Sequence, residues 1–491
     1  MKIDRRALLQ SAAAGVAGIP VHAGSRRRPN VLLIIVDEWR AQACSYAGDA
    51  NVATPHLDGL AREGVSFDTA ISGCPVCCPA RASLLTGQYP LTHGVFINDV
   101  ELKPRGVTLG EAFAAAGYRT GYIGKWHVYG SPDGRYGRRL EYIPKDHRFG
   151  FDYWKTCECT HEYNRSLYYD GDDRTPKYWA GYDAIAQTAD ACDFIEKEAG
   201  GPRPFCLALS LGPPHFPYET APASYRARFA GREIHLRPNV PAARRAEAAE
   251  ILRGYYAHIE ALDDCVGRLL ERLKRSEIEE ETIVLFLSDH GDMMLSQGLT
   301  TKLYPWDESL RVPFLVRYPR GGVAGGRRVR TPVDLPDVMP TLLGLAGIAI
   351  PRTAQGADRS ALASGRAPDR GRPALIGLPV PFTEARRYGF AEYRGLRTQR
   401  HTYVRSIHGP WLLYDNEADP LQMRNLCGSR AAGKLQAALD RSLNEELARV
   451  GDEFRPAEEY VGREELGHYD ELKTPIGFMR SPWGDWESTL R

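Results

Sequence analysis

The sequence predicts an α/β protein with a large, mainly parallel sheet flanked by helices and a smaller C-terminal domain that contains an antiparallel sheet. Unbroken apolar runs rich in β-branched residues, such as residues 31–36 and 282–287, are typical of strands buried on both faces. They alternate with helical patterns, such as residues 242–274 and 335–345, which indicates helices on both sides of the sheet. At 491 residues and 43% hydrophobic content, the chain can bury a substantial core.

The first 23 residues are typical of an export signal. Arg5-Arg6 precedes a short apolar, alanine-rich run, and Val21-His22-Ala23 offers small residues for cleavage. We therefore expect residues 1–23 to be a signal peptide of the twin-arginine type, read by the twin-arginine export machinery, and the protein to be periplasmic or extracellular. No apolar stretch is long enough to span a bilayer comfortably, so we expect no stable membrane insertion.

Charge and cysteine content exclude several functions. The net charge of +1 falls to about −1 once the leader, which carries three cations and one anion, is removed, so there is no general attraction for nucleic acid. Ten cysteines in a chain of this length do not form a disulfide scaffold. Cys157 and Cys159 could be a redox or metal pair, but no second pair has the spacing of a zinc site.

Polar side chains follow both apolar runs. In open α/β sheets, ligands bind at the carboxyl ends of the strands, so two strand ends bring oxygen and nitrogen donors to one place. These donors are Asp37, Glu38, Asp289 and His290. A hard divalent cation suits the carboxylates, whereas the histidine leaves magnesium and manganese open beside calcium. Asp292 is expected to cap a helix that follows it.

The segment from Cys77 to Gly87 reads C-x-P-x-R and ends in L-T-G. Of the three neighbouring cysteines only Cys77 fits this register, because Cys74 would need proline at position 76 and Cys78 would need it at position 80. The segment resembles the signature of the type I sulfatases, members of the alkaline-phosphatase-like superfamily. In that family the cysteine is oxidised to formylglycine, whose hydrate is the nucleophile. The family usually has serine where Ala80 stands.

The resemblance covers nearly the whole chain after the leader, and it implies a cofactor and partners. Cys77 would be converted by a formylglycine-generating enzyme, and the product would bind calcium together with Asp37, Glu38, Asp289 and His290. Many family members carry aspartate where Glu38 stands. The longer side chain could bind the ion directly or only hydrogen-bond a ligand.

The remaining site residues also follow from the resemblance. Gly124-Lys125-Trp126-His127 matches a G-K-W-H segment, which implies that Lys125 holds the sulfate oxygens. His127 would take the proton from the second hydroxyl of the sulfated hydrate, which releases sulfate. His215, in a proline-rich loop after the apolar strand 205–211, would protonate the leaving oxygen together with Lys302. Arg81 would orient the hydrate and offset charge on the sulfate.

The domain boundaries follow from composition. Residues 29–351 form the predicted catalytic domain, and residues 352–373, rich in Gly, Pro, Ala and Arg, resemble a linker. Residues 374–491 form the smaller α+β domain, in which short alternating segments at 395–398, 401–404 and 411–415 predict antiparallel strands.

The function predicted by these features is hydrolysis of a sulfate ester, with a sulfated small molecule or glycan as substrate. Residues 151–169 interleave aromatic and polar side chains, as sugar-binding pockets do, and His161 and Asn164 are the candidate substrate contacts. One rival is a phosphodiester or phosphonate monoester hydrolase on the same fold. Another is a catalytically inactive sulfated-glycan binding protein, which would have no need of the complete catalytic set.

Overall fold

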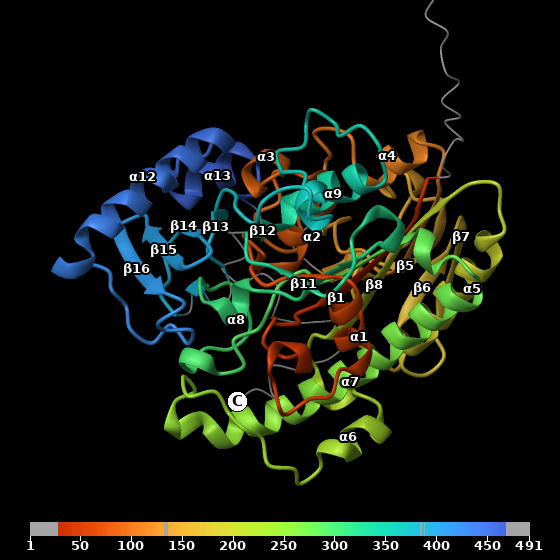
Figure 1. Cartoon of the computed structure of the whole chain (residues 1–491), viewed down its shortest axis with the longest axis horizontal. Helices are drawn as coiled ribbons and strands as arrows, with labels where there is room; N and C mark the ends of the chain where they lie inside the picture. Colours follow the sequence, from red (N-terminus) through yellow and green to blue (C-terminus); the bar gives the residue numbers. More distant parts are fainter. Residues whose placement is uncertain (1–27, 132–135, 383–384, 387, 468–491) are drawn as a thin grey trace, which may run out of the picture.

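The computed structural model describes residues 28–131, 136–382, 385–386 and 388–467 (Figure 1). The predicted signal peptide lies outside these ranges. The strands are β1 (Asn30–Asp37), β2 (Val65–Phe67), β3 (Ala70–Ile71), β4 (Arg119–Lys125), β5 (Tyr153–Cys157), β6 (Leu167–Asp170), β7 (Asp173–Tyr178), β8 (Phe205–Pro214), β9 (Thr282–Ser288), β10 (Phe314–Arg317), β11 (Arg327–Val329), β12 (Val333–Asp334), β13 (Ala374–Leu378), β14 (Tyr393–Arg397), β15 (His401–Ser406) and β16 (Gly409–Asp415). The helices are α1 (Pro55–Glu63), α2 (Cys77–Thr86), α3 (Pro90–His93), α4 (Leu109–Ala115), α5 (Asp183–Ala199), α6 (Ala223–Phe229), α7 (Arg245–Arg275), α8 (Asp307–Leu310), α9 (Val338–Leu345), α10 (Ser360–Ala363), α12 (Gly433–Val450) and α13 (Ala457–Arg463).

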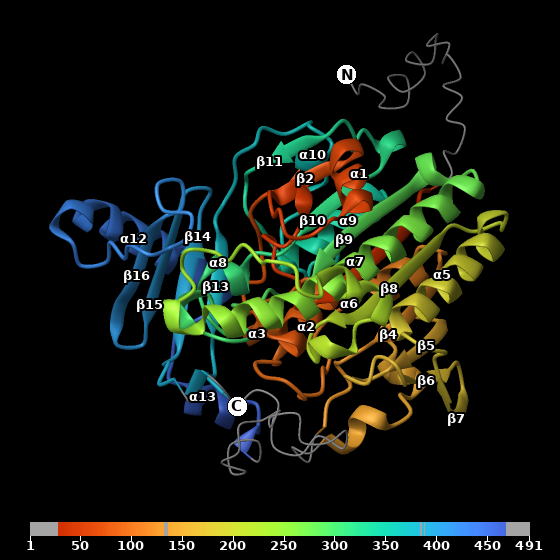
Figure 2. The same cartoon turned by 90° about the horizontal axis from the view of Figure 1, so that it is seen from below.

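The large sheet confirms the predicted fold class. Its ten strands are ordered β11-β2-β10-β9-β1-β8-β4-β5-β6-β7. The central strands β9, β1, β8, β4 and β5 run parallel, whereas β10 on one side and β6 and β7 on the other are antiparallel to their neighbours. Figure 2 shows this sheet with α5, α6 and α7 along one side of it.

Strand β1 contributes to two hydrophobic cores, one on each face of the sheet. Leu32 and Ile34 pack in the core formed with α1, α5 and α7. Leu33 and Ile35 pack in the core formed with α2, α4 and α9. Successive side chains of a strand point to opposite faces, so a strand covered on both sides must be apolar at every position. This explains the unbroken apolar run at residues 31–36.

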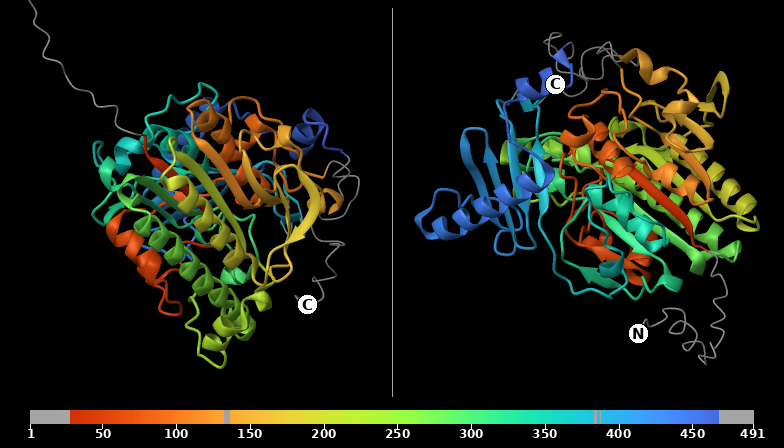
Figure 3. Two further views of the ribbon diagram at one scale, coloured as in Figure 1. Left: turned by 90° about the vertical axis from the view of Figure 1, so that its right-hand side faces the viewer. Right: turned by 90° about the horizontal axis from the view of Figure 1, so that it is seen from above.

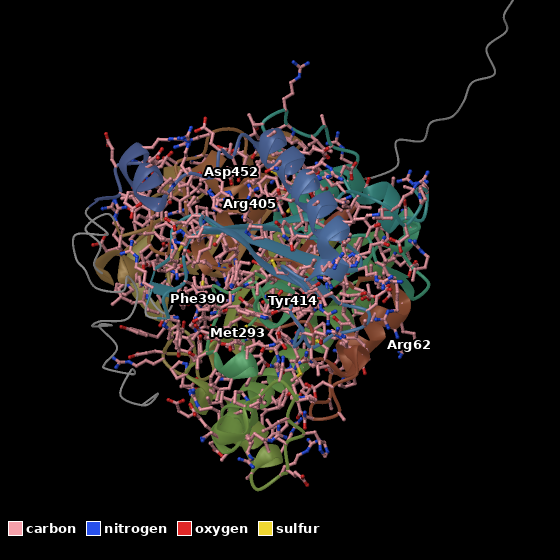
Figure 4. All side chains as sticks on the ribbon, turned by 90° about the vertical axis from the view of Figure 1, so that its left-hand side faces the viewer. Arg62, Met293, Phe390, Arg405, Tyr414 and Asp452 are labelled. Atoms are coloured by element: carbon pink, nitrogen blue, oxygen red, sulfur yellow. The ribbon has the colours of Figure 1, made fainter. Side chains whose placement is uncertain are left out.

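The small sheet, ordered β13-β14-β15-β16, is antiparallel throughout, as predicted for the C-terminal segments. Helix α12 packs on it through Leu439, Leu443 and Leu447. Figure 3 shows this blue C-terminal part at one side of the molecule, and Figure 4 looks onto it, with Tyr414 and Asp452 labelled around the sheet. A buried ion pair from Arg397 in β14 to Asp307 in α8 joins the sheet to the rest of the chain.

The structure adds detail to the segment predicted as a linker. Residues 352–373 contain α10, and Asp369 there accepts hydrogen bonds from the backbone N–H groups of Arg330 and Thr331.

The prediction that Asp292 caps a helix is wrong. Met294 and Leu295 have φ angles of 44° and 64°, a left-handed conformation in which a helix cannot start, and Asp292 instead accepts a hydrogen bond from the Met294 N–H at 2.6 Å. Within the described ranges, no helix has both the length and the apolarity needed to cross a membrane.

Candidate active site

Cys77 is the first residue of α2, and its thiol is buried. The first helical turn leaves its backbone N–H groups without partners inside the helix, so Pro79 costs no hydrogen bond there. The same N–H groups favour negative charge at the helix start. Burial would raise the pKa of Cys77, but the cations of Lys302 and Lys125 lower it well below its ordinary value. An anionic group at this position is therefore stabilised.

Four donors converge around this thiol. The donor atoms of Asp37, Cys77, Asp289 and His290 all lie within 4.8 Å of one another, and all four residues are buried. Cys77 Sγ lies 3.1 Å from His290 Nε2 and 3.7 Å from Asp37 Oδ1. Parallel pairing of β1 with β9 aligns Val36 with Ser288, which places the two aspartates after them side by side.

These donors fit a divalent cation. Burial raises the pKa of Asp289, and the neighbouring Asp37 carboxylate raises it further, because two negative charges are held close together away from water. A hard cation would relieve this repulsion, and carboxylate oxygens and an imidazole nitrogen suit calcium, magnesium or manganese.

Two cations already lie against the aspartates. Arg81, one helical turn beyond Cys77, donates from Nε to Asp289 Oδ2 at 3.0 Å and from Nη2 to Asp37 Oδ2 at 3.4 Å. Lys125, at the end of β4, forms a buried ion pair with Asp37. Gly124 has a φ of 100°, and a Cβ there would lie 2.0 Å from the Ser210 carbonyl oxygen, so only glycine allows β4 to deliver Lys125 beside β8.

Glu38 takes part in a second cluster rather than in the set of four donors. Its Oε2 lies 2.7 Å from His215 Nε2 and 3.2 Å from Lys302 Nζ, and the latter two atoms are 2.7 Å apart. Glu38 also lies within 4.8 Å of Asp37 and His215 through their potential donor atoms. Its φ of 68° turns the chain sharply after β1, which points consecutive carboxylates in different directions.

In the second cluster, the negative charge of Glu38 lies against the positive charges of His215 and Lys302. Burial would lower the pKa of His215, but the Glu38 carboxylate raises it to about 9. His215 Nδ1 donates to the Phe216 carbonyl oxygen at 3.0 Å, so the exchangeable proton sits on Nε2, facing Glu38 and Lys302. At neutral pH this nitrogen carries its proton.

A third group surrounds His127 and was missed by the sequence analysis. Asp99 Oδ1 lies 3.7 Å from His127 Nε2, and Arg139 holds the same carboxylate with two hydrogen bonds of 2.8 and 2.6 Å. Burial would raise the pKa of Asp99, but Arg139 lowers it well below its ordinary value, so the carboxylate stays charged. Asp99 and His127 are far apart in the segment between α3 and β5 and belong to no common motif, so no sequence signal pairs them.

Asp292 and Ser210 were also not assigned to the site. Burial raises the pKa of Asp292 well above its ordinary value, and its hydrogen bond with Glu38 adds to this effect. Asp292 Oδ2 accepts a hydrogen bond from the Tyr218 hydroxyl at 3.2 Å. Ser210 Oγ accepts one from Arg81 Nη1 at 2.7 Å. Both groups hold charged residues of the site in place.

The two candidate substrate contacts lie in different environments. The ring of His161 stacks on that of His215, with centroids 4.6 Å apart and an interplanar angle of 2°. Asn164 is exposed and donates from Nδ2 to the Thr220 carbonyl oxygen at 2.9 Å. His161, which is half-buried, thus contacts the buried site through His215, whereas Asn164 is exposed beside it.

Comparisons with known proteins agree with this geometry. The model of the sulfatase family matches residues 29–348, and that of the C-terminal region of N-sulphoglucosamine sulphohydrolase matches residues 296–449. An ulvan-active sulfatase from Formosa agariphila is 44% identical over 88% of this chain and 84% of its own.

Solved structures share the fold. A sulfatase structure from work on glycosaminoglycan metabolism by Bacteroides thetaiotaomicron has a TM-score of 0.78 and 27% identity, covering 90% of this chain and 100% of that one. The phosphonate monoester hydrolase of Agrobacterium radiobacter has a TM-score of 0.69 at 24% identity, covering 86% and 96%, which shows a shared fold. The family match over most of the chain, together with the 44% identical relative, shows that this protein belongs to the sulfatase family.

Proposed function

We propose that the protein hydrolyses sulfate esters carried on carbohydrates. The observation that carries this proposal is the placement of Cys77, in its C-x-P-x-R segment, among buried carboxylates and cations, in a chain 44% identical to an ulvan-active sulfatase. The relatives act on ulvan and on glycosaminoglycans, which are sulfated carbohydrates. A glycan is also the sulfate ester that an exported enzyme would meet.

In this proposal a formylglycine-generating enzyme converts Cys77 to formylglycine. The aldehyde hydrate supplies an attacking oxygen and a second hydroxyl for releasing sulfate, which serine and cysteine lack. The start of α2 and the cations around position 77 would stabilise the attacking oxygen in its anionic form.

A divalent cation would be held by Asp37, Asp289, His290 and the group at position 77. When bound, it would add positive charge beside the attacking oxygen and the anionic ester. We favour calcium from the family resemblance, with magnesium and manganese as alternatives. In this proposal Glu38 does not bind the cation. It accepts hydrogen bonds from His215 and Lys302 and so positions both side chains.

Proton transfers fall to two separate groups. His215, whose pKa of about 9 keeps Nε2 protonated at neutral pH, would donate that proton to the leaving sugar oxygen, with Lys302 beside it. Lys125 and Arg81 would offset the charge of the sulfate oxygens. On the other side, His127 would accept the proton of the second hydroxyl, and Asp99 would orient its ring and increase its basicity.

The rival function on this fold is hydrolysis of phosphodiesters or phosphonate monoesters, and the shared fold with the Agrobacterium enzyme supports it. A catalytically inactive binding protein is disfavoured, because a binding site alone has no use for a protonated His215–Lys302 pair and a separate His127–Asp99 pair. Substrates that differ only in the reacting group separate the first two functions.

The first prediction tests the reaction. Protein produced with a formylglycine-generating enzyme should carry an aldehyde at position 77 that reacts with hydrazide, as shown by peptide mass spectrometry. It should hydrolyse an aryl sulfate faster than the matching aryl phosphodiester and phosphonate, and Cys77→Ala should abolish this activity. The matched control, Cys74→Ala, should stay active, because Cys74 lies outside the motif register. Full activity in Cys77→Ala, or a preference for the phosphorus esters, would rule out the proposed function.

The second prediction concerns the metal. Asp289→Asn keeps the shape of the side chain but removes a negative charge, so the protein should lose stoichiometric divalent metal, measured by elemental analysis, and most of its activity. The control Asp264→Asn alters a partly exposed acidic group near His56 and Asp263. This variant should keep both its bound metal and its activity. Chelation of the native enzyme should give the same loss, and added calcium should restore activity. Full activity in a metal-free preparation would contradict this assignment.

The third prediction concerns Asp99. Asp99→Asn should lower kcat and KM together by about tenfold or more and leave kcat/KM unchanged, because His127 acts only after the alcohol has left and the sulfated intermediate then accumulates. A pre-steady-state burst of phenol release should then precede a slower steady state. Asp146→Asn, which changes an exposed carboxylate on the neighbouring loop, is the control and should show no burst. A variant that loses activity without a burst would show that Asp99 is only structural.

The fourth prediction separates the substrate contacts. Asn164→Ala should raise KM for a sulfated oligosaccharide and spare a small aryl sulfate that does not reach the surface loop. His161→Ala should reduce kcat on both, because its ring stacks on His215. If Asn164→Ala affects neither substrate, residue 164 contributes nothing to glycan binding.

Export is proposed from the leader alone. The twin-arginine route carries folded proteins, so Cys77 would be converted and the metal loaded before export. Replacing Arg5 and Arg6 together by lysine should retain the protein in the cytoplasm, as judged by cell fractionation, and continued export of this variant would refute the route.

A further inference from the structure

A polar cavity of about 440 Å³ lies outside the catalytic residues, between the loop that follows β1 and the C-terminal sheet. Residues from α7, α8 and the end of β14 complete its walls. Its charged lining consists of Arg40, Arg237, Arg311, Arg397, Asp49 and Asp307. Arg40 is two residues beyond Glu38, so the cavity borders the loop that carries this active-site residue.

The cavity holds more positive than negative charge. The negative charge of Asp307 is balanced by Arg397, which donates two hydrogen bonds to this carboxylate at 3.1 and 3.2 Å. Arg237 pairs with Glu308 at 3.1 Å. Even when Glu308 is added to the two lining carboxylates, the four arginines exceed the acids by one. Burial lowers the pKa of Arg237, and the repulsion from Arg40 and Arg311 lowers it further although Glu308 opposes this.

Several polar atoms of the lining have no hydrogen-bond partner in the described part of the chain. They are Arg40 Nε, Gln42 Oε1 and Arg311 Nε. Arg40 is 2% exposed; its guanidinium hydrogen-bonds the Tyr256 hydroxyl and interacts electrostatically with the carboxylates of Asp49 and Glu308. Arg311 Nε is 3.9 Å from Asp307, beyond hydrogen-bond distance. A buried guanidinium such as that of Arg40 is costly unless an anion balances its charge. Arg311, whose side chain is 28% exposed, lines the same cavity.

The chemistry of these groups indicates their ligand. A planar guanidinium donates two parallel hydrogen bonds to the oxygens of a tetrahedral anion, and several arginines around one space form a typical site for such a group. The volume falls within the range of about 300–1,000 Å³ that is usual for small-molecule sites, which leaves room for a sugar ring beside the anion. Gln42 Oε1 would accept a hydrogen bond from a hydroxyl of such a ring.

We propose that this cavity is a second, non-catalytic binding site for a sulfate group, either as the free ion or attached to a sugar. The choice of sulfate rests on the proposed function. The site itself is formed by side chains that take no part in the reaction, so it can be tested in protein with unconverted Cys77.

Equilibrium dialysis of the full chain against labelled sulfate, with chloride keeping the ionic strength constant, is the direct test. The native protein should bind two sulfate ions, one in the active site and one in the cavity. The double variant Arg237→Gln/Arg311→Gln should keep the first and weaken the second by about tenfold or more. Arg253→Gln is the matched control. The Arg253 side chain is 27% exposed, close to the 24% of Arg237 and the 28% of Arg311, and Arg253 lines a different cavity.

Several results would overturn the proposal. They are a bound-sulfate count that is the same in the native protein and in the double variant, or equal losses in the control. If the double variant does not fold, Arg311→Gln alone serves, because Arg311 Nε makes no hydrogen bond within the described chain and its ion pair with Asp307 is long, at 3.9 Å. Selenate soaked into crystals of the native protein should then give an anomalous peak between Arg40 and Arg311, and its absence would equally reject the site.

Kinetics distinguish the two sources of the sulfate group. If the cavity holds a sulfate on a glycan, the double variant should raise KM for a sulfated oligosaccharide and leave KM for an aryl sulfate unchanged. If it holds the free ion, both KM values should stay the same while the bound ion is lost. A protein that binds two sulfates but hydrolyses no sulfate ester would refute the catalytic proposal and leave this site standing.

Discussion

The burial of Asp37 and Asp289 next to each other is the constraint on which the site depends. Parallel strands β1 and β9 end at the same edge of the sheet, so the aspartates that follow them meet where neither can reach water. Arg81 and Lys125 reduce the repulsion, because both pair with Asp37 and Arg81 also pairs with Asp289. Loss of one partner from such a buried cluster leaves an uncompensated charge and costs about 3–5 kcal/mol. Helix α2 starts at Cys77 and carries Arg81 one turn later, so one helix delivers both the thiol and a cation that balances the two aspartates.

The charges of the site are divided into three groups with different tasks. The first consists of the donors around Cys77. The second is the Glu38–His215–Lys302 cluster, in which a carboxylate keeps the imidazole protonated. The third is Asp99 with Arg139, behind His127. The two histidines thus have separate carboxylate partners, Glu38 for His215 and Asp99 for His127, and each ring is oriented independently of the other.

The small C-terminal sheet is joined to the catalytic part by buried polar contacts as well as by apolar packing. The Arg397–Asp307 pair and the Tyr393 hydroxyl, which donates to the Leu303 carbonyl oxygen next to Lys302, both cross this boundary. The arginine-lined cavity lies at the same boundary. A surface formed by two parts of the chain is a common place for a ligand site, because neither part alone has to fill the space between them.

The sequence by itself determined the main sheet, the antiparallel C-terminal strands and the position of Cys77. Each depends on local patterns: apolar runs for doubly covered strands, alternation for the small sheet, and the register of proline and arginine after one cysteine. The partners of Glu38, Asp99 and Asp292 were decided by the tertiary structure. Glu38 follows Asp37 directly, yet its left-handed backbone turns it toward His215 and Lys302, and Asp292 meets a turn where a helix was expected. Such pairings join residues tens to hundreds of positions apart through the stacking of strand ends, and no local pattern in the chain records which side chains will face each other across that edge.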